Sequence, residues 1–360
     1  MGKAVGAARH DLIEAKGSPH ERGVRVGGHY RRTLLNLLKE NYRYYVEVAG
    51  TSREDVLSRA ARFRKATEDF SPLLGEEVRG IAEGAGVKVD EVYVLAAFNE
   101  LYYPSVRRGC TSFAVRDGAT ADGLTYVGQN NDDAVEPWLR GDCVTLVRYV
   151  QNEGPNVLAY SYAGIPAQMG INSSGLALCA NALHYDRVAT GVPMFCLVRE
   201  MLNQKSVDDA IELISAARRP YALNFVLGDA RGIADVETTP KKIEVTRSDR
   251  MLYHTNHYLC MKDAEIGKQT GKRFHNTKVR CARIAELLGS GEGKLDLELL
   301  EAYLRDHKNR PDSVCRHAGE SPGYGGIYKT FDSMIYIPEK REGWLTRGNP
   351  CETEYVRYAA

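Results

Sequence analysis

The residues best suited to chemistry lie at the step Gly109-Cys110, where a charged, helix-rich segment gives way to strand-like sequence. If the peptide bond between these two residues breaks, Cys110 becomes a new N-terminus that carries both a thiol and a free α-amino group. The pKa of such an amine is about 7.7–8.0, so part of it is unprotonated near neutral pH and can act as a general base. The pair therefore indicates a nucleophile that carries its own base. An ordinary turn beside a core thiol has the same two residues, so the downstream sequence must decide between the two interpretations.

The composition excludes several classes of function. The chain has 360 residues, of which 43% are hydrophobic and 26% charged, and this is enough for a large buried core. Lys and Arg total 48 against 47 acidic residues, a balance that gives no indication of a nucleic-acid partner. No apolar stretch approaches the length of a membrane helix, and the first residues lack the apolar core of a secretory signal. We therefore expect a cytoplasmic protein with no membrane partner.

The eight cysteines are scattered and form no Cys-x-x-Cys pair. This spacing predicts neither a zinc knuckle nor a thioredoxin-type motif, and it fits a reduced compartment better than a disulfide framework. Cys179 and Cys196 lie in apolar runs and are expected to be core thiols. We expect neither a metal nor a cofactor.

The spacing of apolar residues predicts helices over residues 20–100 and mostly strands after Cys110. Strands are expected at residues 111–116, 124–128, 144–150, 157–162, 168–171, 175–180, 224–227, 233–237, 243–246 and 327–337, and further helices at residues 194–203, 206–217, 277–288 and 297–306. No linker is evident. The pattern predicts a single α+β domain over residues 1–360, with antiparallel sheets covered by helices.

A polar run, Gly128–Asp133, follows directly after the expected strand over Leu124–Val127. If that strand pairs with the strand of Cys110, the run brings a carboxylate close to the thiol, and Asp132 could then orient the amine or the thiol. A polar turn with side-chain caps explains the same composition.

Three other polar groups are candidates for the same site. Asn181 is flanked by small apolar residues on an expected strand, so its amide needs buried partners, either a substrate or a structural hydrogen bond. Asn256 could supply an oxyanion-hole amide. The nearby His254 and His257 have a spacing compatible with a metal site, but no third ligand cluster accompanies them. Arg316 could neutralise a carboxylate near the nucleophile or be a surface charge.

Taken in order, these pieces resemble the acyl-coenzyme A:6-aminopenicillanic acid acyltransferase family, cysteine N-terminal-nucleophile (Ntn) hydrolases of the isopenicillin N acyltransferase type. The resemblance is spread over most of the chain. The motifs that carry it are Gly17–Gly23 with Gly28, Glu77–Gly84, Gly109-Cys110-Thr111, Gly128–Asp132, Asn181–His184, Gly191-Val192-Pro193, His254–His257 and Cys315-Arg316.

The resemblance implies a four-layer αββα sandwich of two stacked antiparallel sheets. It also implies self-cleavage between Gly109 and Cys110. The products would be a helical N-terminal subunit, residues 1–109, and a catalytic subunit, residues 110–360, which stay associated.

The resemblance further implies roles for individual residues. Cys110 would be the nucleophile with its own α-amine as base, Asp132 would orient that amine and the thiol, and Asn256 would supply the oxyanion-hole amide. Asn181 and Arg316 match polar active-site positions in the wider choloylglycine-hydrolase-like group.

Two departures from the family pattern concern the acyl pocket. Asn131 stands where the penicillin enzyme has Trp, and the Gly323–Gly326 region also differs, so the resemblance does not carry over the penicillin substrate itself. The expected reaction forms an acyl-enzyme on Cys110 and passes the acyl group to water or an amine. This covers linear amide hydrolysis and N-acyl transfer with acyl-CoA as a small-molecule co-substrate.

Other hypotheses stay open at this point. They are a pure hydrolase without acyl-CoA, an unprocessed pseudoenzyme or binding protein with the same fold, and a metalloprotein built on His254 and His257. A homo-oligomer is compatible with each of them.

Overall fold

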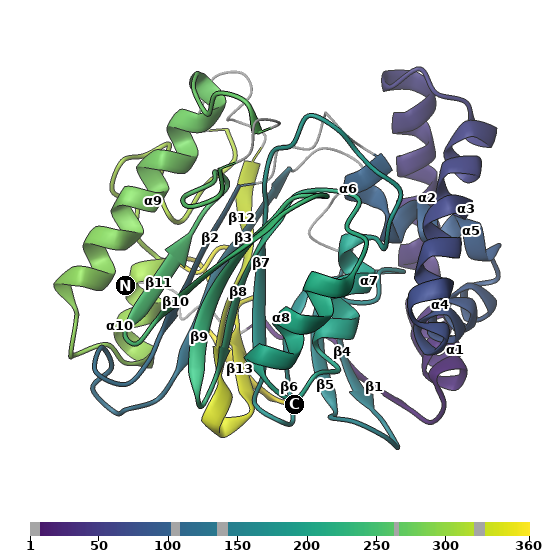
Figure 1. The fold of residues 1–360 in the computed structure, drawn as a ribbon. Coiled ribbons are helices and arrows are strands. Elements are labelled where there is room, and N and C mark those ends of the chain that lie inside the picture. Colours follow the sequence, from purple (N-terminus) through teal and green to yellow (C-terminus); the bar gives the residue numbers. More distant parts are fainter. Residues whose placement is uncertain (1–7, 102–108, 135–142, 263–265, 320–327) are drawn as a thin grey trace, which may run out of the picture.

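A computed structural model of the protein describes residues 8–101, 109–134, 143–262, 266–319 and 328–360. In this structure two β-sheets lie face to face, and each is covered on its outer face by helices (Figure 1). The chain therefore forms the predicted α+β fold, a four-layer αββα sandwich. Among the described residues no helix is both long and apolar enough to cross a lipid bilayer.

Helices dominate the described chain upstream of Cys110. They are α1 (Pro19–His29), α2 (Arg31–Arg43), the π-helical turn η1 (Tyr44–Val48), α3 (Arg53–Phe70), α4 (Pro72–Ala85), α5 (Val89–Ala96) and α6 (Phe98–Leu101). Ser18, Ser52 and Ser71 begin α1, α3 and α4, because each side-chain oxygen accepts a hydrogen bond from a backbone N–H three residues later. Gly86 ends α4 in the left-handed conformation, with φ 69°. These local signals set the helix boundaries in the segment where the sequence predicts helices.

Helices α1 and α4 pack at unusually close range. Gly23 and Gly27 on α1 face Gly80 and Gly84 on α4, and a Cβ added at any of the four would overlap main-chain atoms of the opposite helix. Each helix thus presents two glycines four residues apart, and only glycine allows the two backbones to touch.

A buried ion-pair network joins this helical segment to the rest of the chain. The Glu77 carboxylate on α4 accepts hydrogen bonds from Arg22 on α1, at 3.0 Å, and from Arg199 on α7 (Met194–Met201), at 2.9 Å. The Arg199 guanidinium also stacks 4.3 Å from the ring centre of Tyr149. Glu77 and Arg199 are each 1% exposed, so both charges depend on this network for their solvation.

The larger sheet has eight strands in the order β1-β4-β5-β6-β7-β8-β9-β10. Their bounds are β1 (Leu12–Lys16), β4 (Val144–Val150), β5 (Val157–Tyr162), β6 (Met169–Asn172), β7 (Ala177–Ala182), β8 (Leu223–Asp229), β9 (Gly232–Thr238) and β10 (Ile243–Ser248). All neighbours pair antiparallel except β1 and β4, which are parallel. This sheet is covered by the N-terminal helices together with α7 and α8 (Val207–Ala216) (Figure 1).

The smaller sheet has six antiparallel strands in the order β11-β2-β3-β12-β13-β14. Their bounds are β2 (Gly109–Val115), β3 (Tyr126–Ala134), β11 (Met251–His254), β12 (Tyr328–Ile337), β13 (Glu342–Leu345) and β14 (Val356–Ala359). Helices α9 (Lys272–Ser290) and α10 (Leu297–Leu304) cover its outer face (Figure 1).

Alternation along the strands divides the core into layers. In β2, Ala114 packs between the two sheets, whereas Phe113 and Val115 pack outward beneath α9 and α10. A third cluster fills the space between the larger sheet and the N-terminal helices. Cys179 lies between the sheets and Cys196 in the third cluster, both fully buried as predicted.

The strand prediction is wrong in one important place and incomplete in others. The polar run Gly128–Asp133 does not lie beyond a strand end, because β3 continues to Ala134 and buries these side chains. Gln129, Asn130, Asn131 and Asp133 have partners in other layers and Asp132 has one on the adjacent strand β12, which offsets most of the cost of burying the run, although Asp132 Oδ2 accepts no hydrogen bond from the described residues. The short strands β1, β11, β13 and β14 were not predicted, since four or five residues give little alternation to detect.

Candidate active site

Strands β2 and β3 pair at the centre of the smaller sheet and set the geometry around Cys110. Their register places Gly109 opposite Asp132 and Cys110 opposite Asn131. Every residue of β2 is buried, and Cys110 is 2% exposed. The predicted cleavage bond therefore lies inside a strand.

The side chain of Cys110 points into the space between the two sheets, because it lies on the same face of β2 as Ser112 and Ala114. There the Cys110 Sγ lies 3.9 Å from Asn131 Oδ1. The amide of Asn131 bonds onward to the larger sheet: its Nδ2 donates to the hydroxyls of Tyr160 and Tyr162 at 3.3 and 3.2 Å. The thiol thus has polar surroundings in a buried place.

Asn256 lies against the main chain of Cys110. The backbone N–H of Cys110 donates to Asn256 Oδ1 at 2.7 Å, and Asn256 Nδ2 donates to the carbonyl of Ala182 at 3.0 Å. An amide nitrogen carries two N–H groups, so Nδ2 keeps a second donor beside that to Ala182. Asn256 thereby touches the nitrogen that the predicted cleavage would convert into an α-amine.

Arg280 from α9 holds the same strand from its outer face. Its Nη1 donates to the Cys110 carbonyl at 2.5 Å and to Thr111 Oγ1 at 2.9 Å, and its Nη2 donates to Asn256 Oδ1 at 2.9 Å. Burial lowers the pKa of Arg280 to about 10, which leaves the guanidinium charged at neutral pH. One cation thus fixes both Cys110 and Asn256.

Asp132 lies on the outer face as well, beside Gly109. Its Oδ1 accepts from Thr330 Oγ1 at 2.7 Å, and its Oδ2 lies 3.8 Å from Arg316 Nη1, an ion-pair distance too long for a hydrogen bond. Oδ2 accepts no hydrogen bond from the described residues and is fully buried. Burial raises the pKa of Asp132 to about 6, although Arg316 and Arg280 both act to lower it.

The close packing at Gly109 explains the glycine at that position. A Cβ there would overlap Arg316 Nη1 and would lie 3.2 Å from Asp132 Oδ2. Any larger residue before Cys110 would have to displace the guanidinium.

Comparison with known proteins identifies the family. The family model described as acyl-coenzyme A:6-aminopenicillanic acid acyl-transferase matches residues 119–352, well over half of the chain. The chain belongs to this family.

Three known proteins are similar to this chain, in sequence or in structure. The acyl-coenzyme A:6-aminopenicillanic-acid-acyltransferase 40 kDa form of Emericella nidulans is 28% identical over 299 residues, which cover 80% of this chain and 79% of that protein. A variant of conjugated bile acid hydrolase from Clostridium perfringens is 15% identical with a TM-score of 0.46, covering 70% of this chain and 97% of its own. Penicillin V acylase from Agrobacterium tumefaciens is 11% identical with a TM-score of 0.44, covering 66% and 82%.

Asn181 of this acyltransferase-family protein lies on β7, across the inter-sheet space from β2. Its Nδ2 donates to Ser112 Oγ at 2.5 Å and to Asn224 Oδ1 at 2.8 Å. Ser112 is two residues from Cys110 on the same strand face, so Asn181 holds the strand of Cys110 in place. Its Oδ1 is buried and accepts no hydrogen bond from the described residues.

The two histidines beside Asn256 have protein partners. His254 Nε2 contacts Glu237 at 2.9 Å and its Nδ1 contacts the Thr255 carbonyl at 2.8 Å, so both ring nitrogens are engaged. Burial acts to lower the pKa of His254, but Asp235 and Glu237 outweigh it and raise that pKa. His257 Nδ1 contacts Thr277 Oγ1 at 3.1 Å. The contacts of these histidines fit a structural role next to Asn256.

The structure therefore gathers all five candidates, namely Cys110, Asp132, Asn181, Asn256 and Arg316, around the strand of Cys110. The sequence reasoning missed Arg280 and Thr330. Arg280 could have been found, because it takes a core position on the amphipathic helix α9, in line with the buried residues Thr277 and Ile284. A charged residue on a buried face needs a charged or polar partner. The Gly323–Gly326 region, named as a departure from the family, lies outside the described residues.

Proposed function

We propose that this protein is a self-processing cysteine Ntn enzyme. The chain would cut itself between Gly109 and Cys110 into residues 1–109 and 110–360. The Cys110 thiol would then form an acyl-enzyme and pass the acyl group to water or to an amine.

The observation that carries the proposal is a buried acceptor without a donor. Asp132 Oδ2 lies beside Gly109, accepts no hydrogen bond from the described residues, and has two guanidinium groups, Arg316 and Arg280, acting on its charge. A buried carboxylate oxygen left in this state costs free energy. Cleavage would turn the amide nitrogen of Cys110 into an ammonium group one residue away, and that group can donate to Oδ2.

Processing needs only groups on the strand and its neighbours. The Cys110 sulfur attacks the carbonyl carbon of Gly109, the carbon–nitrogen bond breaks, and the proton of the thiol ends on the Cys110 nitrogen. Water then hydrolyses the resulting thioester, which frees the Gly109 carboxylate and restores the thiol. Arg280, bonded to the carbonyl of Cys110, would hold the downstream side of the bond still during the exchange.

In turnover the freed α-amine would take the proton of the thiol as the sulfur attacks a substrate carbonyl. Asn256 would serve twice: its Oδ1 orients the amine, and the second N–H of its Nδ2 faces the developing oxyanion. One donor of this kind stabilises a transition state by about 3–4 kcal/mol. Asp132 would stabilise the amine rather than the thiol, since it lies on the opposite face of β2 from Cys110 Sγ.

The family membership supports a proposal for the substrate class. The similar protein of Emericella nidulans is named for acyl transfer from coenzyme A to 6-aminopenicillanic acid. For this chain we propose a small acyl amide or an acyl-CoA as acyl donor. Asn131 and the tyrosines bonded to it give a polar wall beside the thiol, which favours a donor with a polar group near its carbonyl.

Intact-mass measurement of the purified protein tests the processing step. The wild-type chain should give pieces of about 12 and 28 kDa, in proportion to 109 and 251 residues of a 40.0 kDa chain. Cys110→Ala should remain intact, because it lacks the attacking sulfur. Cys260→Ser, a change of an exposed cysteine outside the site, should process like the wild type.

A wild-type chain that stays intact but still binds acyl amides would contradict the proposal and identify a binding protein instead. For a chain that is processed, acyl release measured with and without an amine acceptor separates transfer from hydrolysis.

A further inference from the structure

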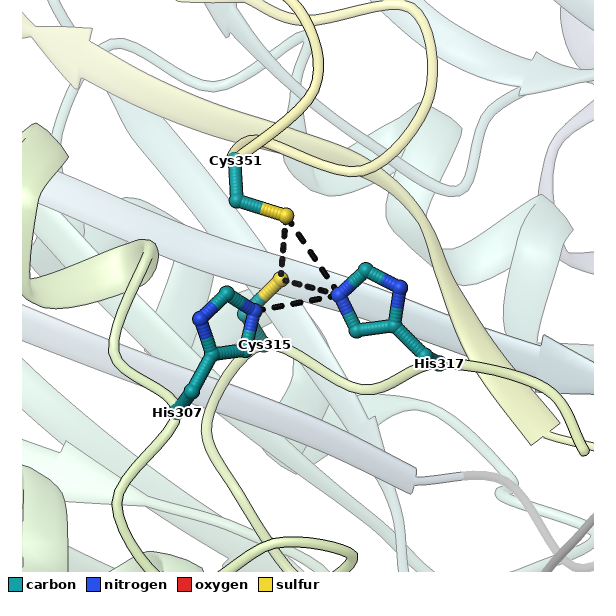
Figure 2. A group of neighbouring side chains, drawn as sticks. All are labelled: His307, Cys315, His317 and Cys351. Carbon is teal, nitrogen blue, oxygen red and sulfur yellow. Dashed lines mark hydrogen bonds between the residues drawn. The ribbon is translucent and has the colours of Figure 1, made fainter. Parts of the chain in front are cut away.

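A second cluster of reactive side chains lies away from the thiol of Cys110. His307, Cys315, His317 and Cys351 point toward one another (Figure 2). Each offers one ligand atom, and these atoms all lie within 4.8 Å of one another. Two imidazoles and two thiols form a donor set that zinc binds in structural sites.

Four of the six distances between these donor atoms are close to the edges of a tetrahedron around a metal ion. With Zn–S bonds of about 2.3 Å and Zn–N bonds of about 2.0–2.1 Å, ideal edges are about 3.8 Å between sulfurs, about 3.6 Å from sulfur to nitrogen and about 3.4 Å between nitrogens. The Cys315 and Cys351 sulfurs are 3.6 Å apart, far beyond a disulfide bond. His317 Nε2 lies 3.8 and 3.4 Å from these sulfurs and 3.0 Å from His307 Nε2.

Neighbouring residues already orient two of the four side chains. His317 turns its other nitrogen, Nδ1, toward the carboxylate of Glu352 at 3.5 Å, which leaves Nε2 facing the centre of the cluster. Asn349 Nδ2 donates to Cys315 Sγ at 3.6 Å, as it would to a thiolate. Such carboxylate–histidine and amide–thiolate contacts are the usual supports of metal ligands.

We infer that His307, Cys315, His317 and Cys351 form a structural Zn²⁺ site. The ion would gain two Zn–N and two Zn–S bonds, and the two thiols would release their protons on binding. Four protein ligands close the coordination shell, so the ion would hold structure rather than activate water.

The site would cross-link two distant segments of the chain. His307, Cys315 and His317 follow α10, whereas Cys351 lies between β13 and β14. Arg316 stands between two of the ligands, and its main-chain carbonyl accepts from Asn349 Nδ2 at 2.7 Å. The ion would thereby fix the backbone that carries Arg316 toward Asp132.

Elemental analysis of the full-length protein, purified from zinc-containing medium under reducing conditions, tests the inference directly. We expect about one zinc per chain. Cys351→Ser should lower this content at least about tenfold, since one thiolate supplies much of the binding free energy. Cys260→Ser, which also changes an exposed cysteine, should keep the full content.

Two further measurements make the test independent of any single variant. His307→Gln should lose zinc as Cys351→Ser does, whereas His275→Gln, on an exposed histidine, should not. Protein reconstituted with Co²⁺ should show the visible absorption of a tetrahedral site, with thiolate-to-cobalt bands that weaken in Cys351→Ser.

Four results would overturn the inference: a zinc-free protein that takes up no zinc from solution, unchanged zinc in both ligand variants, iron or copper in place of zinc, or a Cys315–Cys351 disulfide in freshly purified protein. None of these readouts depends on acyl transfer or on chain cleavage, so the zinc site and the proposed function succeed or fail separately.

Discussion

Cys110 and Asp132 lie on neighbouring strands, yet their side chains project from opposite faces of the sheet. This follows from the register, which puts Asp132 across from Gly109 rather than from Cys110. Asn256 and Arg280 bond to the main chain of Cys110, while Asp132 lies beside Gly109, so these three side chains surround the Gly109–Cys110 step. At the residue scale the candidate site is built around the backbone.

The pKa of Asp132 makes the proposed activity pH-dependent. Burial raises that pKa to about 6, and a carboxylate that stabilises the amine must be ionised. We expect kcat/KM to rise with pH over a range below about 6, because the ammonium group proposed beside Oδ2 would lower the pKa of Asp132 from its value in the uncut chain. In Arg316→Met the loss of a nearby cation should move this acid limb to higher pH, while Arg247→Met, on an exposed arginine paired with Asp208, should leave it in place.

The same pKa affects folding stability with the opposite trend. From the ordinary value 3.8 up to about 6, folded Asp132 holds a proton that the unfolded chain has lost. Its contribution to stability is therefore complete below pH 3.8 and declines as the pH rises through that interval.

For the activity profile, an acid limb of kcat/KM that does not move in Arg316→Met would show that Asp132 does not titrate beside Arg316.

Gly109 should tolerate no side chain. In Gly109→Ala the new Cβ overlaps the Arg316 guanidinium, which must move away from Asp132. Overpacking of this kind costs about 1–3 kcal/mol, so we expect processing to slow by about tenfold to a hundredfold. The time course of fragment appearance on a denaturing gel measures the rate.

Gly289→Ala provides the matched control for that change, because a Cβ at Gly289 on α9 meets no atom within 4 Å. Processing of Gly109→Ala at the rate of this control would contradict the proposed packing requirement.

The sequence was sufficient to identify residues whose types are rare in their setting. Cys110 after a glycine, Asn181 among small apolar residues and Asn256 between histidines each stood out, and the structure gathers them. Arg280 did not stand out, because a lone arginine within a helix is usually exposed. The signal for it was its place in line with Thr277 and Ile284 on α9, whereas its contacts with Cys110 and Asn256 depend on the packing of α9 on β2 and could not be predicted.

At the scale of elements, strand β3 shows why the polar composition of residues 128–133 led to the wrong prediction that they lie beyond a strand end. Six polar or glycine residues in succession favour a turn, but their partners come from other layers. Asn130 donates to the carbonyls of Leu304 and Val314, and Gln129 donates to the carbonyl of Ala180. Since these contacts are distant in sequence, no local pattern predicts them, whereas the serine caps that begin α3 and α4 join residues three apart in the chain.

The helix layer should be more sensitive to the loss of Glu77 than to changes at exposed positions. Glu77→Ala leaves the guanidinium groups of Arg22 and Arg199 buried without their shared carboxylate. Removing one partner of a buried ion pair costs about 3–5 kcal/mol, and the free energy of unfolding in urea should fall by that amount. Glu76→Ala, next to it in sequence but exposed and paired with Arg79, should cost about 0–1 kcal/mol.

Equal stabilities of Glu77→Ala and Glu76→Ala would mean that the buried arginines find other acceptors. The adjacent Asn203 and Gln151, which already accept from Arg199, would then be the first to examine by a second substitution.

At the scale of the whole molecule, the segments on either side of Cys110 share one core. Strand β1 pairs with β4 from Leu12–Leu146 to Lys16–Val150. The core cluster beneath the N-terminal helices includes residues from both segments. Cutting one peptide bond removes none of these contacts.

We therefore expect the two processed pieces to elute as one species in size-exclusion chromatography and to separate only in denaturant. High salt should not part them, because screening acts mainly on exposed charges and the contacts across the cut are buried. Release of the smaller piece from native protein would contradict this expectation.

The position of the Gly109–Cys110 bond inside β2 has a consequence for quality control. The groups proposed to surround the bond come from β3, the segment after β11, α9 and the segment before β12, so they meet only after segments far apart in the sequence have assembled. A misfolded copy would keep this amide intact, so its Cys110 would never gain the α-amine that serves as the base. Processing would thus act as a folding checkpoint, because only a chain that has assembled the site acquires the proposed activity.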